Sequence, residues 1–111
     1  MANKDTVRIR HMLDAANKAL EFTKGKSRGD LDSDEKLALA LVRLLEIFGE
    51  AATGLSEAFK EKHPDIPWRS VIGTRNRLIH GYFDVDLDIV WNIVTRDLPP
   101  IVKKFQELSA R

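Results

Sequence analysis

The chain has 111 residues, of which 43% are hydrophobic, and this length is typical of one domain. Its 18 basic and 17 acidic residues give a net charge of +1, which excludes the uniformly basic surface of a general nucleic-acid binder. There is no cysteine, which excludes disulfides and thiolate metal sites. The polar first residues and the lack of a long apolar window predict a single cytoplasmic domain over residues 1–111, without a membrane contact.

Apolar residues recur at helical spacing along almost the whole chain, and this pattern predicts an all-α fold. The first predicted helix covers residues 5–24, and a polar loop with glycines follows it. The second begins near Ser33 and continues to about His63, which makes it about 30 residues long. Apolar and small residues occupy more than one side of this helix, so we expect it to be buried on several sides and to leave apolar surface for a partner.

Two further helices are predicted in the second half of the chain. A short one begins at Pro67, which suits the first position of a helix, and stops at Gly81. The last begins after Asp84 or Asp86, and the prolines at 99–100 are expected to kink it or to divide it in two. The sum is an antiparallel bundle of four helices, or of five if the prolines break the last one.

The segment 75–82 carries the polar groups that suit a chemical role. Positive charge gathers from Arg69 to His80, a stretch without an acid, although the net charge of the chain is near zero. Arg75 can bind a phosphate through two hydrogen bonds, and His80 can exchange a proton near neutral pH. These groups meet the needs of metal-free RNA cleavage, in which a base removes the proton of the ribose 2′-hydroxyl and a cation stabilises the pentacoordinate phosphate.

The spacing of these residues raises a geometric difficulty. Positions five apart on a helix point about 140° away from each other, so Arg75 and His80 do not share a face. Either the long Arg75 side chain wraps round the helix, or the helix opens at His80, before Gly81. Asn76 lies four residues before His80 and so shares its face, which suits it to orient the imidazole or to contact the phosphate.

A structural interpretation of the same residues stays open at this point. In it, Arg75 pairs with Glu46 or Glu50 inside the bundle, and His80 is a helix-terminal residue stabilised by the helix dipole. Glu50 is either an exposed residue or a buried partner of Arg75 or Arg77. We favour the buried partner, because the glycine that precedes Glu50 permits close approach of another helix.

Other residues offer weaker candidates for a site. Asp84, Asp86 and Asp88 lack the glycine and the distal glutamate of a calcium loop, and helix capping explains them better. The three histidines lie far apart in sequence, which argues against zinc, and no glycine-rich phosphate loop occurs. Trp68 and Trp91 are expected in the core and not as base-stacking surfaces. We therefore expect no metal and no cofactor.

Arg75, His80 and Tyr82 together match the motif RX4HXY, and with it the chain resembles the HepT-like toxins, a branch of the HEPN superfamily (higher eukaryotes and prokaryotes nucleotide-binding). The resemblance includes Asn76, a polar residue directly after the arginine. It also includes residues 46–51, which look like the glutamate-and-glycine segment of the family's long helix. The proline and tryptophan before the motif and the aspartate-rich start of the last helix are similar too, so the resemblance covers nearly the whole chain.

The resemblance implies a metal-independent endoribonuclease that acts as the toxin of a bacterial toxin–antitoxin pair. Related ribonucleases form homodimers in which two arginine–histidine pairs meet in one composite site at the interface. By this resemblance Arg75 steadies the phosphate, His80 acts as acid or base, and Asn76 supports them. The implied partner is a minimal nucleotidyltransferase that neutralises the toxin by attaching AMP to the motif tyrosine, here Tyr82.

Two other interpretations remain from the sequence. The first is a HEPN domain that binds nucleotides or serves as an adaptor of a nucleotidyltransferase without cleaving RNA. The second is a purely structural helical partner of a neighbouring protein. Growth arrest when the chain is expressed alone, and a small nucleotidyltransferase encoded beside it, would favour the toxin over both.

Overall fold

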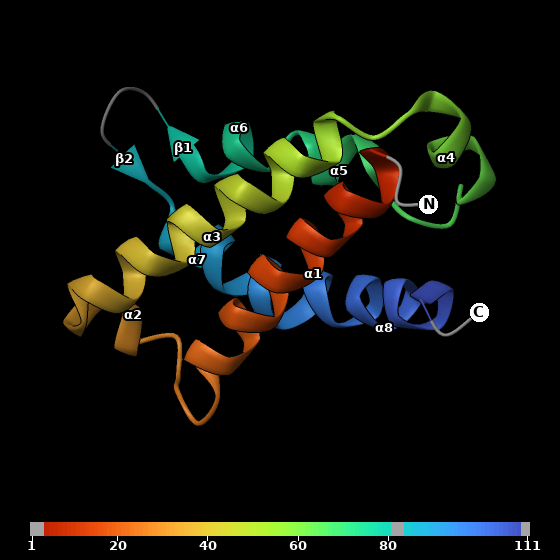
Figure 1. The fold of residues 1–111 in the computed structure, drawn as a ribbon. Helices are drawn as coiled ribbons and strands as arrows, with labels where there is room; N and C mark the ends of the chain where they lie inside the picture. The colour runs from red at the N-terminus through yellow and green to blue at the C-terminus, as the bar shows by residue number, and fades with distance from the viewer. Residues whose placement is uncertain (1–3, 81–83, 110–111) are drawn as a thin grey trace.

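The computed structural model describes residues 4–80 and 84–109. Helix α1 (Lys4–Thr23) and helix α3 (Glu35–Thr53) run in opposite directions beside each other and form the centre of the fold (Figure 1). The short helix α2 (Asp30–Ser33) lies in the connection between them. The prediction of a first helix over residues 5–24 is confirmed to within one residue at each end. Gly25 follows with a φ of 75°, a left-handed conformation that favours glycine and ends the helix.

The second predicted helix is shorter than its apolar pattern indicates. Helix α3 begins after Asp34, whose carboxylate accepts a hydrogen bond from the Leu37 amide at 3.1 Å, and it ends at Thr53. The expectation of one helix of about 30 residues, continuing to His63, is therefore wrong. A separate helix, α4 (Glu57–Lys62), follows a turn and stands beside the first turns of α1 (Figure 1).

Ser56 explains why the helix is interrupted. Its amide donates to Asp5 of α1 at 2.8 Å, and its hydroxyl donates to the same carboxylate at 2.6 Å. In a continuous helix that amide would donate to the carbonyl four residues earlier. The Ser56 hydroxyl also accepts from the Phe59 amide at 3.1 Å and so caps α4. A side chain of α1 thus redirects the chain between α3 and α4.

The third predicted helix is divided and also ends early. Helices α5 (Trp68–Ile72) and α6 (Thr74–Leu78) meet at Gly73, and Pro67 is the residue that caps α5. The helix does not reach Gly81, because the backbone becomes extended after Leu78. Strand β1 (Ile79–His80) pairs antiparallel with β2 (Asp84–Val85), with Ile79 opposite Val85 and His80 opposite Asp84.

The last helical segment begins where the sequence predicts. Asp86 caps helix α7 (Leu87–Asn92), accepting from the amides of Asp88 at 3.0 Å and Ile89 at 3.1 Å, so the capping prediction is confirmed for Asp86, whereas Asp84 lies in β2. The π-helix η1 (Ile93–Asp97) and helix α8 (Leu98–Ser109) continue directly from α7. Pro99 and Pro100 have no amide hydrogen to donate. The wider π-helical turn immediately before them lets the helical path continue through the prolines.

The elements form the all-α antiparallel bundle that the sequence predicts, with one added two-stranded ribbon. Helices α5 and α6 lie against α3, while η1 and α8 lie against α1. Trp68 stacks on Phe105 with ring centroids 6.2 Å apart, and Trp91 packs against the core, so both tryptophans have the predicted structural role. The largest fully buried side chains include Met12, Leu41 and Phe48.

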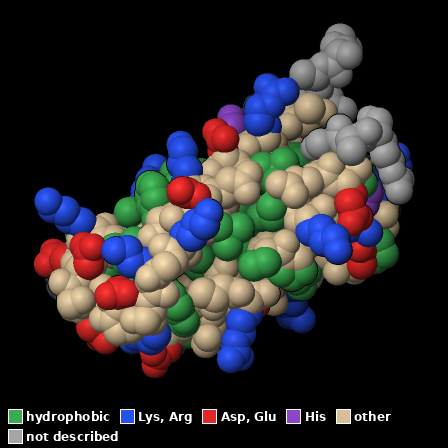
Figure 2. Space-filling model, turned by 90° about the horizontal axis from the view of Figure 1, so that it is seen from below, with side chains coloured by type: hydrophobic (Ala, Val, Ile, Leu, Met, Phe, Trp, Pro, Cys, Tyr) green, Lys and Arg blue, Asp and Glu red, His purple; other side chains and the backbone are tan. Residues whose placement is uncertain are grey.

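The surface carries charges of both signs. Figure 2 shows Lys and Arg side chains interspersed with Asp and Glu around exposed hydrophobic atoms. Such mixing fits the net charge of +1 and means that any attraction for a polyanion has to be local. Within the described ranges, no helix has the length and apolar character needed to cross a membrane.

Candidate functional site

Arg75 lies on α6, where that helix packs against α3. Its Nε atom is 3.8 Å from a carboxylate oxygen of Glu46, a residue of α3. The Arg75 side chain is 69% exposed, whereas that of Glu46 is 23% exposed. The contact is too long for a hydrogen bond, so it leaves the guanidinium free to turn its donors toward another anion.

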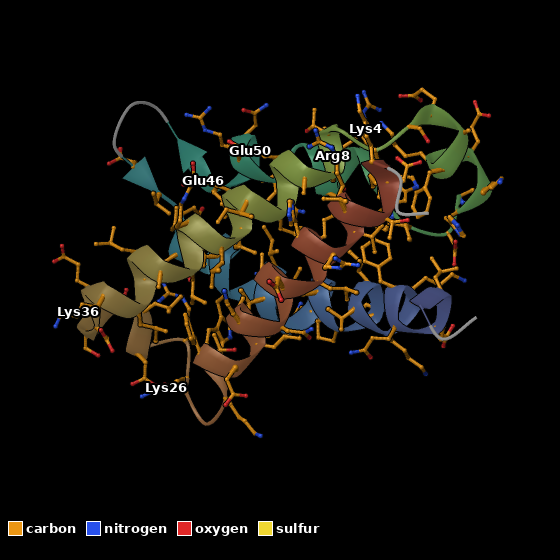
Figure 3. All side chains as sticks on the ribbon, viewed as in Figure 1. Lys4, Arg8, Lys26, Lys36, Glu46 and Glu50 are labelled. Atoms are coloured by element: carbon orange, nitrogen blue, oxygen red, sulfur yellow. The ribbon has the colours of Figure 1, made fainter. Side chains whose placement is uncertain are left out.

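Glu50 does not have the predicted role of a buried support. It is exposed, one helical turn after Glu46, and Figure 3 shows the two acids following one another along α3. The favoured prediction of a buried Glu50 that holds Arg75 or Arg77 is therefore wrong. The Glu50 side chain is exposed to solvent, and Glu46 is the acid that contacts Arg75.

Arg77 faces a different part of the molecule. Its guanidinium donates to the Asp97 carboxylate in η1 at 3.2 Å, and both side chains are partly exposed. Residues two apart on a helix point in nearly opposite directions, so Arg75 faces α3 while Arg77 faces η1. The positive charge that the sequence concentrates between Arg69 and His80 is thus divided between two sides of α6.

Gly49 allows α6 to approach α3 closely. A Cβ atom at this position would lie 3.3 Å from the carbonyl oxygen of Val71 and 3.4 Å from the Cβ of Thr74. Thr74 is buried, and its hydroxyl donates to the carbonyl of Val71 at 2.6 Å. The expectation that Gly49 permits close helix approach is confirmed, and this contact fixes the start of α6 one residue before Arg75.

The early end of α6 removes the angular difficulty posed by the spacing of Arg75 and His80. Because the helix ends at Leu78 and His80 lies in β1, helical angles do not apply across the pair. Of the two alternatives, opening of the helix before Gly81 is the one observed. The same change removes the helical reason for placing Asn76 on the face of His80, and Asn76 itself is exposed.

Two predicted site residues lie partly or wholly outside the described part of the chain. The backbone of His80 pairs with Asp84, while the His80 side chain lies outside the described part. Tyr82 lies outside the described residues altogether. The predicted catalytic and modification roles of these two residues therefore remain predictions.

Two cavities are lined by described residues other than Arg75. The larger has a volume of about 560 Å³ and lies between α1, α4 and α8, where Arg10, Phe59 and Leu108 contribute to its lining. A second, of about 320 Å³, lies between Asp65 and residues of η1 and α8 that include Arg96. Among the described residues, no group of three or more His, Cys, Asp or Glu side chains is arranged to hold a metal ion.

Sequence reasoning did not identify all the groups around Arg75. It considered Glu46 only as an alternative to Glu50, and it did not identify Asp97 as the partner of Arg77. Glu46, Gly49 and Glu50 lie within two turns of one helix, so spacing alone does not show which acid meets α6. Asp97 is 20 residues from Arg77, and no local pattern connects them.

A family model and several relatives match most of this chain, and they agree on the family. Residues 12–108 match the family described as "Ribonuclease HepT-like". The "Probable ribonuclease HepT" of Thermococcus cleftensis is 42% identical over 88 residues, which cover 79% of this chain and 80% of that protein. "Putative RNase MJ1380" of Methanocaldococcus jannaschii is 39% identical over 95 residues, covering 86% and 87% of the two chains.

A third relative is also named as a ribonuclease. "Putative RNase TTE0752" of Caldanaerobacter subterraneus is 38% identical over 100 residues, which cover 90% of this chain and 89% of that protein. No solved structure matches this chain.

Proposed function

The chain belongs to the HepT-like ribonuclease family of the HEPN superfamily, and from this premise we propose that it is a metal-independent endoribonuclease that uses Arg75 and His80. The observation that carries the proposal is the state of Arg75. Its guanidinium is exposed near the end of α6, is only loosely held by Glu46, and belongs to the segment that leads directly into β1 and His80. An arginine so placed is available to bind a phosphodiester of RNA.

The proposed chemistry is an intramolecular transesterification followed by release of the leaving strand. His80 accepts the proton of a ribose 2′-hydroxyl, and the resulting oxygen attacks the adjacent phosphorus. Arg75 stabilises the negative charge on the pentacoordinate phosphate. The bond from phosphorus to the 5′-oxygen then breaks, and that oxygen takes up a proton from solvent, to which His80 returns the proton that it accepted. The products are a 2′,3′-cyclic phosphate and a 5′-hydroxyl, and Asn76 supports the bound phosphate.

We propose further that two chains form a homodimer with a composite site. The large exposed hydrophobic side chains of the described part are Val7, Phe22 and Leu39, of which Leu39 on α3 is 62% exposed. This apolar surface is smaller than the surplus expected from one long helix, because α3 buries most of its apolar residues. Light scattering during size exclusion tests the proposal, and a species at the chain mass of 12.6 kDa would contradict it.

The proposed biological role is that of a toxin controlled by a cognate minimal nucleotidyltransferase. In this proposal the partner attaches AMP to Tyr82, which follows His80 by two residues in the sequence. The added phosphate competes for the arginine, and the adenosine adds bulk beside the site. The family membership and the sequence match at Tyr82 support this regulation.

The decisive experiment compares wild type with His80→Ala and Arg75→Ala on a single-stranded RNA in the presence of EDTA. We expect wild type to release 2′,3′-cyclic phosphate ends, and each variant to be slower by at least about 100-fold with an unchanged melting temperature. If His80→Ala cleaves as fast as wild type, His80 is not catalytic. If wild type binds RNA but leaves it intact with and without added divalent cations, the non-catalytic adaptor interpretation replaces the ribonuclease.

A further inference from the structure

The charge balance around Arg75 is unfavourable for RNA if Arg75 is its only cation. Glu46 lies 3.8 Å from Arg75, and Glu50 is exposed on the next turn of the same helix. Arg75 thus has one acid beside it and a second acid four residues further along the same helix, and both acids would repel an incoming phosphate. If the site binds RNA, as proposed above, the same face needs further positive charge.

Arg43 supplies such a charge on α3. It is exposed and lies three residues before Glu46 and seven before Glu50, which places all three on one face of the helix. Side chains three apart have Cβ atoms about 5–6 Å from each other, so Arg43 lies beside Glu46, the residue that Arg75 contacts. Within the described part of the chain, no ion pair or hydrogen bond of the Arg43 side chain is observed.

The two arginines have different surroundings, and this difference assigns a separate task to each. Arg75 contacts the largely covered side chain of Glu46, whereas Arg43 extends from the exposed face of α3. Arginine can reach several ångströms from its helix and bind a phosphate through two donors. Arg43 shares a helix face with Glu46, and Glu46 is the residue that Arg75 contacts.

We propose that Arg43 is a substrate-binding residue, which holds a phosphate of the RNA strand next to the one that is cleaved. This inference rests on the proposed function and adds a second cation to the same site. Arg43 acts only in holding the strand, whereas Arg75 also stabilises the charge on the reacting phosphate. Loss of Arg43 therefore raises KM and leaves kcat nearly unchanged, while loss of Arg75 lowers kcat.

The test uses the full chain and a fluorescently labelled single-stranded RNA with 2′-O-methyl riboses, which cannot undergo the 2′-hydroxyl attack. Fluorescence anisotropy then measures binding without any contribution from cleavage. We expect Arg43→Ala to weaken binding about tenfold, and Arg43→Lys to recover part of the loss. The slope of log affinity against log salt should fall by about 0.7, the change for one phosphate contact on a single strand.

Arg10→Ala is the matched control, because Arg10 is also an exposed helical arginine but lines the cavity between α1, α4 and α8. It should change affinity less than about twofold. Equal weakening by Arg43→Ala and Arg10→Ala would overturn the proposal, since the effect would be one of overall charge. Dissociation of a dimer in Arg43→Ala, seen by light scattering, would also overturn it and make Arg43 an interface residue.

The binding assay separates this inference from the ribonuclease proposal. If wild type does not cleave natural RNA but Arg43→Ala weakens binding with the expected salt slope, the binding role stands and the proposed chemistry fails. If wild type cleaves RNA and Arg43→Ala binds the methylated strand as tightly as wild type does, the chemistry stands and the role of Arg43 is wrong.

Discussion

The Nε atom of Arg75 on α6 lies 3.8 Å from a carboxylate oxygen of Glu46 on α3. This relationship joins the segment proposed to bind RNA to the central helix of the fold. It also places a negative charge beside the cation that a phosphate would need. Glu46 therefore offsets part of the attraction of Arg75 for RNA while it limits where the guanidinium can lie.

Replacing Glu46 by glutamine is expected to lower KM for RNA by about two- to fivefold. The substitution removes the negative charge and keeps the shape, and an exposed ion pair has an energy of about 0.2–1 kcal/mol. Steady-state cleavage kinetics at low salt measure the effect. Glu50→Gln serves as the control, because Glu50 lies on the same helix face but has no observed contact with Arg75, and its effect should be smaller. A higher KM in Glu46→Gln would mean that Glu46 orients Arg75 for binding.

Tyr82→Phe is expected to separate activity from regulation. The phenylalanine keeps the ring and removes the oxygen that accepts AMP, so the variant should cleave RNA like wild type but resist inactivation by the nucleotidyltransferase and ATP. Intact mass spectrometry after incubation gives the number of AMP groups on each protein. AMP additions that persist in Tyr82→Phe would place the modification on another residue.

Gly49→Ala is expected to destabilise the fold by about 1–2 kcal/mol. The added Cβ would press on the backbone carbonyl oxygen of Val71 at 3.3 Å and would contact the Cβ of the buried Thr74 at 3.4 Å. Thermal unfolding measures the change, with Gly29→Ala as a control at which a Cβ meets nothing closer than 4.0 Å. Because α6 has to move, kcat/KM should fall as well. A variant as stable and active as wild type would show that α6 can shift freely.

The stability of the folded state at acidic pH should depend on Asp5. The hydrogen bonds from the Ser56 hydroxyl and amide lower the pKa of Asp5 below its usual 3.8. The folded state therefore gains stability from the carboxylate above about pH 4, and this gain is lost as the pH falls through the lower folded pKa. Asp5→Asn should melt about 2–5 °C below wild type at pH 7, and the difference should shrink below pH 4.

Thermal melts at a series of pH values test this prediction. Asp14→Asn, an exposed change on the same helix, is the control and should follow wild type at every pH. A constant difference between Asp5→Asn and wild type down to pH 2 would show that the Asp5 charge does not contribute to the interaction with Ser56.

Local sequence patterns were sufficient to predict the structure of several parts of this protein. Helical periodicity predicts the bundle, the aspartates at 84 and 86 predict the start of α7 to within two residues, and Gly49 predicts a close helix contact, because each depends on residues within a few turns. The motif around Arg75 was likewise visible without a structure. These features follow from backbone hydrogen bonding and side-chain volume near each position.

Only the tertiary structure decided where α3 and α6 stop and which charges meet. The Asp5 carboxylate accepts a hydrogen bond from the amide of Ser56, which lies 51 residues later in the sequence. This bond ends the continuous helix that the apolar pattern predicts. Ile79 pairs with Val85, and this pairing replaces the last helical turn before Gly81. Arg75 meets Glu46, because the packing of α6 on α3 selects one of two acids with similar spacing. In each case a backbone or charged group finds its partner in a distant segment, and local propensity contains no information about that contact.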